Sequence, residues 1–179
     1  MNPDPTQTQP QTVAVRLLGP DGKLTEAIHV PKIVRSEEAW RARVTPEQFH
    51  VAYEHGTERA FCGVFFDNHK QGVYTCVGCG LPLFRSDAKF DSGTGWPSFF
   101  RPYDEAHIRY IRDTSYGMVR TEEVCARCGS HLGHVFPDGP PPTGQRHCLN
   151  SVSLSFVEAG APLPDVLGRG TPEGAPDAG

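Results

Sequence analysis

Hydrophobic and polar residues alternate over a short stretch near the N-terminus. The alternation covers residues 13–17, stops at the turn sequence Gly-Pro-Asp-Gly of residues 19–22, and resumes over residues 24–30. A period of two places the hydrophobic side chains on one face of a strand. Two such stretches around a glycine-containing turn predict a β-hairpin, which we assign to an N-terminal extension over residues 13–35.

Two sequence signals predict helices directly after this hairpin. Ser36 can cap a short helix that contains Trp40, because a serine oxygen can accept a hydrogen bond from a free N–H of the first turn. Residues 45–48, Thr-Pro-Glu-Gln, match a capping box with proline at the first helical position. We therefore expect two short helices.

The helical period disappears from Phe61 onward. Short stretches such as residues 73–75, 108–112 and 151–157 are separated by clusters of glycine, proline and aspartate. This pattern is typical of antiparallel strands joined by turns. The sequence therefore predicts a mainly β body, and the total length of 179 residues suits one domain, which we assign to residues 36–158.

Both ends of the chain have the composition of disordered tails. Residues 1–12 contain three prolines and, after Met1, no aliphatic or aromatic residue. Residues 159–179 contain five glycines and four prolines. Such segments bury too little apolar surface to offset the entropy of ordering, so we expect both to be disordered.

Charge and hydrophobicity limit the classes of partner. The formal net charge is -4, with 17 Lys+Arg against 21 Asp+Glu, so no broad basic field is available for nucleic acid or anionic lipid. No apolar run approaches the roughly 18 residues of a membrane helix, and the first residues lack the features of a signal peptide. We expect a soluble, cytoplasmic protein without nucleic-acid or membrane partners.

Six cysteines in a reducing compartment are not expected to form three structural disulfides. Four of them form two C-x-x-C pairs, Cys76 with Cys79 and Cys125 with Cys128. Two such turns supply the four tetrahedral sulfur ligands that Zn²⁺ favours and leave no open coordination position. We predict one structural zinc ion per chain, because a redox-active C-x-x-C usually occurs singly beside a βαβ unit.

Cys62 and Cys148 remain, and Cys148 lies on a predicted strand. Alternate side chains share a face, so Arg146, Cys148 and Asn150 should point one way, and the hydrophobic residues at 152, 154 and 156 should continue that face. A cation beside Cys148 favours the nucleophilic thiolate. The alternative is an inert buried cysteine with Arg146 paired at the surface.

Two further segments carry candidate chemistry. His131 and His134 precede Asp138 and a proline-rich loop that leads to the cysteine strand. A histidine can donate a proton near neutral pH, and a carboxylate can fix its tautomer, although either histidine could instead be a core residue. Trp96 belongs to an aromatic cluster at 91–100 that could wall a small apolar pocket or be ordinary core.

In combination, four sets of motifs resemble the B-type methionine sulfoxide reductases. They are SGTGWPSF, the two C-x-x-C pairs, HLGHVFPDGP and RHCLNSVSLSF, and the match covers residues 36–157 in order and spacing. The resemblance implies two antiparallel sheets with short N-terminal helices, the Mss4-like or β-tent fold, and a structural zinc ion.

The resemblance also implies a role for each candidate residue. Cys148 would attack the sulfur of methionine-R-sulfoxide and become a sulfenic acid while methionine leaves. Trp96 would pack against the substrate methyl group. The remaining residues would orient the substrate, lower the pKa of the thiol and protonate the sulfoxide oxygen: His131, His134, Asp138, Arg146 and Asn150.

The sequence departs from one version of the family pattern, in which a cysteine occupies the position of Thr94. Other members carry a cysteine in a stretch like residues 57–63, TERAFCG, where this chain has Cys62. The resemblance therefore implies that Cys62 resolves the sulfenic acid to a disulfide, which thioredoxin reduces. The expected substrate is oxidised methionine in proteins or peptides, and the expected state is a monomer.

Two alternatives belong to other functional classes. A non-catalytic zinc module could keep the β scaffold and bind a protein partner, but this leaves the polar residues around Cys148 unexplained. A different thiol enzyme, such as a glutathione-linked lyase or a thiol peroxidase, would be favoured by a second zinc ion with open coordination. The hairpin at 13–31 lies outside the confident match and has no functional assignment.

Overall fold

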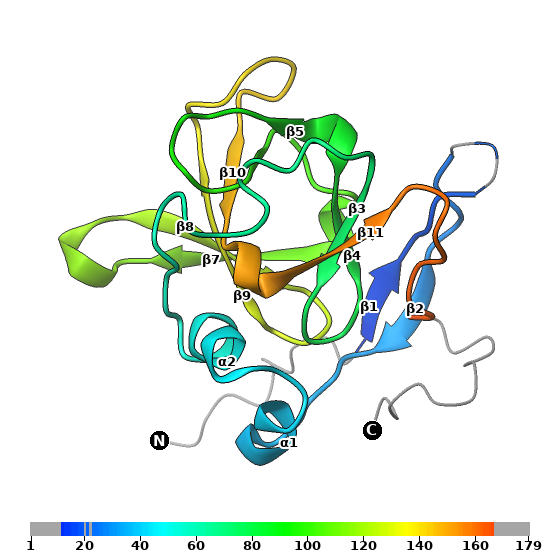
Figure 1. Ribbon diagram of the computed structural model, residues 1–179. Coiled ribbons are helices and arrows are strands. Elements are labelled where there is room, and N and C mark those ends of the chain that lie inside the picture. Colours follow the sequence, from blue (N-terminus) through cyan, green and yellow to red (C-terminus); the bar gives the residue numbers. More distant parts are fainter. Residues whose placement is uncertain (1–11, 20, 22, 167–179) are drawn as a thin grey trace, which may run out of the picture.

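The computed structural model describes residues 12–19, 21 and 23–166 (Figure 1). Two short α-helices, four 3₁₀ turns and eleven strands make up the regular structure of this part of the chain. The helices are α1 (Glu37–Arg41) and α2 (Pro46–Tyr53). The strands are β1 (Thr12–Val15), β2 (Ile28–Pro31), β3 (Gly72–Cys76), β4 (Pro82–Arg85), β5 (Lys89–Phe90), β6 (Ser98–Phe99), β7 (Ile108–Asp113), β8 (Arg120–Cys125), β9 (His131–Phe136), β10 (Arg146–Leu149) and β11 (Leu154–Glu158).

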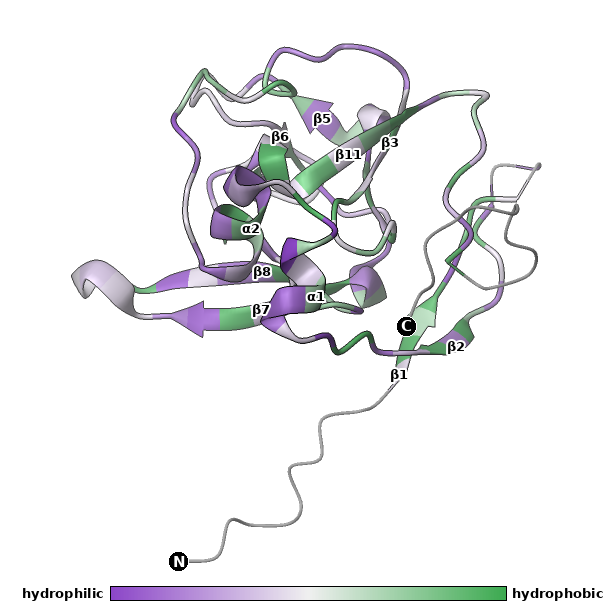
Figure 2. Ribbon diagram, turned by 60° about the horizontal axis from the view of Figure 1, so that its bottom comes forward, coloured by the Kyte–Doolittle hydropathy of each residue, from purple (hydrophilic) through white to green (hydrophobic). Residues whose placement is uncertain are grey.

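The strands form three sheets in which every pairing is antiparallel. The largest sheet has the order β5-β6-β10-β9-β8-β7, a second has the order β11-β3-β4, and β1 pairs with β2. Hydrophobic and hydrophilic segments alternate along β7 (Figure 2), as expected for an edge strand with one solvated face. The predicted mainly β fold with two principal antiparallel sheets and short N-terminal helices is confirmed.

Both predicted helix starts are confirmed. The Ser36 hydroxyl accepts a hydrogen bond from the backbone N–H of Ala39 at 3.2 Å, which caps α1. Thr45 and Gln48 form the reciprocal capping box of α2, with proline at its first position. Trp40 of α1 is buried and stacks on Tyr53 of α2 at 4.5 Å between ring centroids, which holds the two helices together.

The core lies between the two larger sheets. Tyr74 and Phe84 come from β3 and β4, whereas Phe99 and Leu149 come from β6 and β10, and all four are at most 1% exposed. Phe84 stacks on Phe99 at 4.7 Å between centroids, and Tyr74 meets the same ring edge-on at 5.1 Å. These aromatic contacts fix β6, which pairs with the strand β10 that carries Cys148, onto the three-stranded sheet.

The predicted continuous strand through Cys148 is wrong. β10 ends at Leu149, a 3₁₀ turn covers Ser151–Ser153, and β11 then pairs in the other sheet. The Ser153 hydroxyl donates to the carbonyl of His131 at 2.8 Å, and its N–H donates to the carbonyl of Asn150 at 3.1 Å. Because Asn and Ser side chains compete with the strand ladder, the chain turns here, and the hydrophobic residues of β11 do not continue the face of Cys148.

The N-terminal hairpin is confirmed and packs on the body. β1 pairs with β2 in register Val13 with Val30, and both side chains are buried. The N–H of Leu18 donates to the Tyr103 hydroxyl at 2.6 Å, and the N–H of Arg16 donates to His107 Nε2 at 3.1 Å. The extension is therefore part of the folded body.

The predicted start of the C-terminal disordered tail, at residue 159, is wrong, because the ordered chain continues at least to residue 166. Val166 is 4% exposed and packs on the core, and its carbonyl accepts a hydrogen bond from Arg127 Nη1 at 2.9 Å. Residues 159–166 are therefore ordered, because Val166 adds apolar burial that a count of glycine and proline does not capture. The rest of this predicted tail, 167–179, and residues 1–11 of the other lie outside the described residues. Within the described ranges, neither helix is long and apolar enough to cross a membrane.

Candidate active site and metal centre

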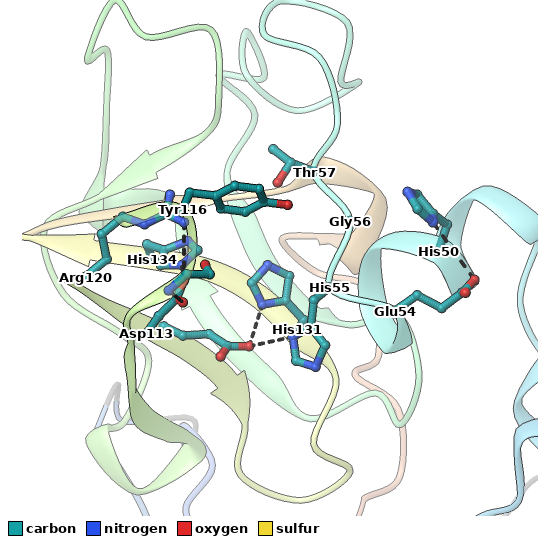
Figure 3. Close-up of a pocket in the computed structure, with 12 residues that line it drawn as sticks. His50, Glu54, His55, Gly56, Thr57, Asp113, Tyr116, Arg120, His131 and His134 are labelled. Carbon is teal, nitrogen blue, oxygen red and sulfur yellow. Dashed lines mark hydrogen bonds and ion pairs between the residues drawn. The ribbon is translucent and has the colours of Figure 1, made fainter. Parts of the chain in front are cut away.

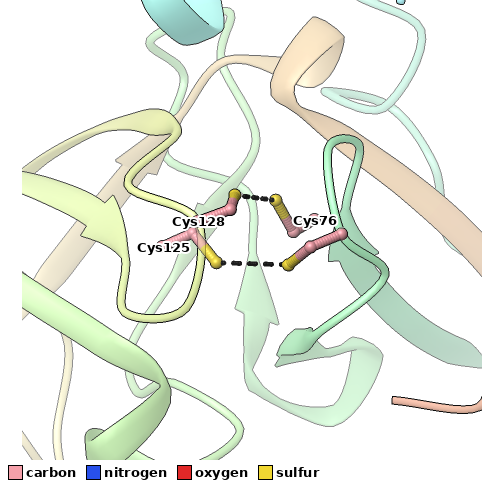
Figure 4. Close-up of side chains that lie close together, drawn as sticks. Cys76, Cys125 and Cys128 are labelled. Carbon is pink, nitrogen blue, oxygen red and sulfur yellow. Dashed lines mark hydrogen bonds between the residues drawn. The ribbon is translucent and has the colours of Figure 1, made fainter. Parts of the chain in front are cut away.

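The four paired cysteines converge between the two larger sheets (Figure 4). Cys76 Sγ lies 3.5 Å from Cys128 Sγ, and Cys79 Sγ lies 3.6 Å from Cys125 Sγ. A tetrahedral zinc ion with Zn–S bonds of about 2.3 Å places its sulfur ligands about 3.8 Å apart. The four sulfurs thus fit a metal ion, and the closest approaches join one C-x-x-C pair to the other.

Each cysteine pair is held in its own turn, and the two turns have the same local geometry. Gly80 and Gly129, which follow the two pairs, have left-handed φ angles of 79° and 76°. Each glycine N–H donates to the carbonyl of the first cysteine of its pair, at 2.8 Å and 2.9 Å. A residue with a Cβ is disfavoured at such an angle, so glycine lets each turn present two sulfurs on one side.

Burial limits how many of the four thiols can ionise together. Hydrogen bonds shared with Cys125 lower the pKa of the Cys76 thiol but raise the pKa values of Cys79 and Cys128. Four buried sulfurs cannot all ionise without a compensating positive charge. Tyr53 of α2 covers the cluster, with its hydroxyl 4.0 Å from Cys128 Sγ. The site is closed, as a structural metal centre requires.

Cys148 lies in the middle of the six-stranded sheet. Its register partners are Ser98 on β6 and His134 on β9, and directly opposed side chains share one face of a sheet. Its side chain is half-buried, and Thr94 hydrogen-bonds its sulfur. Cys148 therefore lies between the loop that carries Trp96 and the strand that carries the histidines.

The predicted effect of Arg146 on Cys148 is only partly right. Burial raises the pKa of the Cys148 thiol, whereas the charge of Arg146 and the hydrogen bond with Thr94 lower it by less. Arg146 acts in the expected direction, but desolvation of the thiolate is the larger effect. In the free protein, the thiol form is therefore favoured.

Asp138 contacts Arg146 and not a histidine. The guanidinium donates two hydrogen bonds to the carboxylate, Nε to Oδ1 at 2.9 Å and Nη2 to Oδ2 at 3.2 Å. This contact lowers the pKa of Asp138. Arg146 also lies over the ring of Phe136, with 4.4 Å between Cζ and the centroid. Asp138 thus orients the cation near Cys148.

The carboxylate that pairs with His134 is Asp113, which no sequence motif indicates. His134 Nε2 lies 2.8 Å from Asp113 Oδ2. Hydrogen bonds from Ser115 and then from His134 hold the pKa of Asp113 well below its ordinary value, so it is an anion that can orient the imidazole. Asp113 ends β7, two strands from His134 in the sheet, and only the fold joins them.

His131 and Asn150 are buried and have protein partners. His131 Nδ1 lies 2.8 Å from Glu122 Oε1, and burial lowers the pKa of His131. The Asn150 amide donates to the carbonyl of Leu132 at 3.1 Å and accepts from the N–H of Glu58 at 3.1 Å. Both ends of the amide therefore tie β9 to the segment that precedes Cys62.

Trp96 and Cys62 lie on two connected loops. Trp96 Nε1 donates to the carbonyl of Glu58 at 3.1 Å, and the N–H of Phe61 donates to the carbonyl of Gly95 at 2.8 Å. Cys62 follows Phe61 and is exposed. The loop with the exposed thiol is thus fastened to the loop with the indole.

Two hollows flank these residues. One, of about 560 Å³, is lined by both predicted histidines together with Asp113, Tyr116, Arg120 and Thr57, among others (Figure 3). Another, of about 250 Å³, is lined by Trp96 and by Phe61, Phe66 and Phe90, among others. The structure therefore does not bring Trp96 and the two histidines into one hollow. Cys148 lies between the two hollows, because Thr94 of the Trp96 loop hydrogen-bonds its sulfur and His134 is its register partner.

Another missed pair is buried beneath the cysteine strand. His147 Nδ1 contacts Glu123 Oε1, and both side chains are fully buried. Burial raises the pKa of Glu123. His147 neighbours Cys148 and therefore faces the opposite side of β10. His147 lies within RHCLNSVSLSF and Glu123 outside the motifs, and their side chains meet only because β8 and β10 flank β9.

Fold and site together define a mainly β protein of the thiol-enzyme class, with a four-cysteine cluster that could hold a metal ion and a separate half-buried cysteine beside a histidine–aspartate pair. Comparison with known families places it more closely. Residues 44–158 match the SelR domain. The chain belongs to this family, the peptide methionine sulfoxide reductases MsrB, and is an oxidoreductase.

Several similar proteins carry the name peptide methionine sulfoxide reductase MsrB. The chain is 59% identical to that of Xylella fastidiosa (strain 9a5c) over 140 residues, which are 78% of this chain and 90% of the relative. It is 58% identical to that of Caulobacter vibrioides (strain NA1000 / CB15N) over 140 residues, with 78% and 88% covered. It is 58% identical to that of Methanosarcina mazei over 127 residues, with 71% and 91% covered.

Proposed function

We propose that the protein reduces methionine-R-sulfoxide in proteins or peptides, with Cys148 as the nucleophile. The observation that carries the proposal is the position of Cys148, half-buried and directly opposite His134, whose imidazole is held by Asp113. A thiol with a positioned proton donor beside it is the arrangement that oxygen transfer to sulfur requires. Family membership supports the same reaction.

In the first step, the Cys148 thiol passes its proton to His134, and the resulting thiolate attacks the sulfoxide sulfur. The oxygen passes to Cys148, which is oxidised to a sulfenic acid, and the substrate sulfur is reduced to the thioether. His134, held by Asp113, supplies the proton that the sulfoxide oxygen needs in order to leave its sulfur, and His131 lies in the same hollow. Trp96 provides an apolar wall for the substrate methyl group.

Arg146 has a measurable electrostatic role in this account. Replacing Arg146 by alanine is expected to raise the pKa of Cys148 further, because the opposing positive charge is lost while burial remains. The rate of Cys148 alkylation by iodoacetamide should therefore reach its midpoint at higher pH than in the parent. The comparison uses the Cys62→Ser background, since Cys62 is exposed. A midpoint that is unchanged or lower would refute an electrostatic action of Arg146.

In the second step, the sulfenic acid of Cys148 condenses with Cys62, which forms a disulfide and releases water. The dithiol of thioredoxin then reduces that disulfide by thiol exchange and becomes oxidised itself. The exposure of Cys62 supports this role, because a resolving thiol and its disulfide must be reached by the reductant.

Replacing Cys62 by serine should separate the two steps. We expect the first turnover to be spared and thioredoxin-dependent turnover to fall by at least about tenfold, because a sulfenic acid has no partner thiol. Rapid-quench measurement of methionine gives the first turnover, and steady-state oxidation of thioredoxin gives the second. The matched control is Ser98→Ala, a neighbour of Cys148 without a thiol. Full thioredoxin-dependent activity of the Cys62 variant would show that another route resolves Cys148.

We propose that the four-cysteine centre holds one structural zinc ion per chain. Its ligands would be Cys76, Cys79, Cys125 and Cys128. Their sulfur spacing supports this ion, and the closed site leaves it no contact with the substrate.

We further propose a cytoplasmic monomer. All six cysteines lie within the described residues and are unpaired, as a reducing compartment would keep them. The net charge of -4 supports neither a nucleic-acid nor a membrane partner.

A stereochemical assay tests the function itself. The protein is incubated with a peptide containing racemic methionine sulfoxide and with dithiothreitol, and each epimer is followed by chromatography. Loss of the R epimer alone is expected, with the S epimer as the internal control. Persistence of both epimers would favour a non-catalytic zinc module that binds a protein partner. Consumption of a glutathione adduct or a peroxide in place of the sulfoxide would favour a different thiol enzyme.

A further inference from the structure

Three side chains of types that can bind a metal ion lie together at the wall of the larger hollow, and Figure 3 labels two of them, His55 and His131. His55 follows α2, Glu122 lies on β8, and His131 begins β9. The same carboxylate oxygen, Glu122 Oε1, lies 2.9 Å from His55 Nδ1 and 2.8 Å from His131 Nδ1. The three ligand atoms all lie within 4.8 Å of one another.

We propose that His55, Glu122 and His131 form a second metal site, for a divalent transition ion of the Zn²⁺ type. Two imidazole nitrogens and one carboxylate oxygen are the protein ligands of one class of catalytic zinc site, which keeps a fourth position open. Zinc bonds of about 2.0–2.2 Å to nitrogen and oxygen place the ligand atoms about 3.3 Å apart. The present separations within the trio therefore need only small movements to hold an ion.

The ion would replace the protons that now join these groups. Each Nδ1···Oε1 contact is a hydrogen bond in the absence of metal, and the ion takes the place of the imidazole Nδ1 protons. Glu122 and His131 are nearly buried, with side chains 11% and 4% exposed, whereas the His55 side chain is 64% exposed. Two ligands are thus fixed by the sheet, and His55 can turn to close the site.

This site is separate from the four-cysteine centre, with which it shares no residue. Its open position faces the hollow that His134 and Asp113 also line. An ion bound there would use His131 as a ligand and would fill the space beside His134. The consequence for activity rests on the proposed function: the bound ion blocks sulfoxide reduction. A thiol enzyme of another kind that used this ion would instead require it.

Binding is tested on the zinc-loaded protein with both other thiols removed, Cys62→Ser and Cys148→Ser. Zn²⁺ alone is the probe, and isothermal titration gives the stoichiometry beyond the structural ion. We expect one further Zn²⁺ per chain and at least tenfold weaker binding after His55→Asn. Asparagine suits the left-handed φ of 56° at this position, so the backbone is kept. The matched control, His50→Asn, lines the same hollow outside the trio and should bind normally.

Absence of a second ion, or equal binding by the His55→Asn variant, would overturn the site. A second experiment measures the rate of R-sulfoxide reduction as a function of Zn²⁺ concentration, in protein that keeps Cys62 and Cys148. The parent should be inhibited over the concentration range in which the ion binds, and His55→Asn should keep the basal activity and resist Zn²⁺ at least tenfold better. Binding without inhibition would overturn the blocking role alone. A protein that binds the ion yet reduces no sulfoxide would disprove the proposed function and leave the metal site standing.

Discussion

Replacing Cys148 by serine is expected to lower the rate of methionine-R-sulfoxide reduction by at least about 10⁴-fold. A serine hydroxyl in the same half-buried position neither ionises near neutral pH nor accepts an oxygen atom. The loss should be the same with dithiothreitol and with thioredoxin, because the chemical step itself is removed. Methionine formation from the R epimer, followed by chromatography, measures it.

The control for Cys148→Ser is Cys62→Ser, a substitution that removes the other thiol outside the metal centre. It is assayed with dithiothreitol. That variant should keep its first turnover. The zinc content and the urea midpoint of both variants should match the parent, which confirms that the loss is chemical. Residual activity of Cys148→Ser above about one per cent of the parent would show that another group attacks the sulfoxide.

The second large effect is expected on stability. Replacing Cys125 by serine should release zinc and abolish cooperative unfolding, because the four sulfurs join the turn between β3 and β4 to the turn between β8 and β9. Structural zinc sites supply about 10–16 kcal/mol of apparent binding free energy in small domains. A typical domain has about 5–15 kcal/mol of stability, so the loss can exceed the whole.

Zinc content by atomic absorption and urea unfolding by tryptophan fluorescence measure this second effect. Cys62→Ser serves as the matched control, since it is the same change at an exposed cysteine outside the centre. It should keep one zinc ion and a cooperative transition. A zinc-free Cys125→Ser protein that unfolds with an unchanged midpoint would show that the centre does not stabilise the fold.

Local signals explain which features the sequence could predict. The capping residues Ser36 and Thr45 act on backbone groups within one turn, so each helix start follows from a few letters. Each C-x-x-C pair likewise sets its own geometry within one turn, closed by Gly80 or Gly129. The two pairs could be matched with each other because four sulfurs suit one ion, whatever the fold between them.

Residues that meet through sheet register could not be predicted in this way. His131 pairs with Glu122 on the neighbouring strand, and His134 pairs with Asp113 two strands away, in a strand order that is set by the whole fold. The nearby carboxylate in the sequence, Asp138, instead pairs with Arg146. Proximity along the chain is thus a poor guide to which carboxylate orients a histidine on an antiparallel sheet.

The turn after Cys148 was missed for a related reason. Period-two alternation continues from Arg146 to Phe156, but hydrogen bonds of Ser153 to β9 and to Asn150 stop the ladder. Alternation reports which faces are apolar and does not report where a strand changes sheets. Val166 shows the same limit at the C-terminal side, where one buried side chain orders a glycine- and proline-rich segment.

The most direct test is whether Cys148 itself takes the oxygen. In the Cys62→Ser variant, which keeps no resolving thiol, a peptide with methionine-R-sulfoxide is added without reductant and with dimedone to trap sulfenic acid. Mass spectrometry then locates and counts the adduct. One dimedone adduct on Cys148 for each methionine formed is the predicted result. Methionine formation while Cys148 stays unmodified would contradict the account.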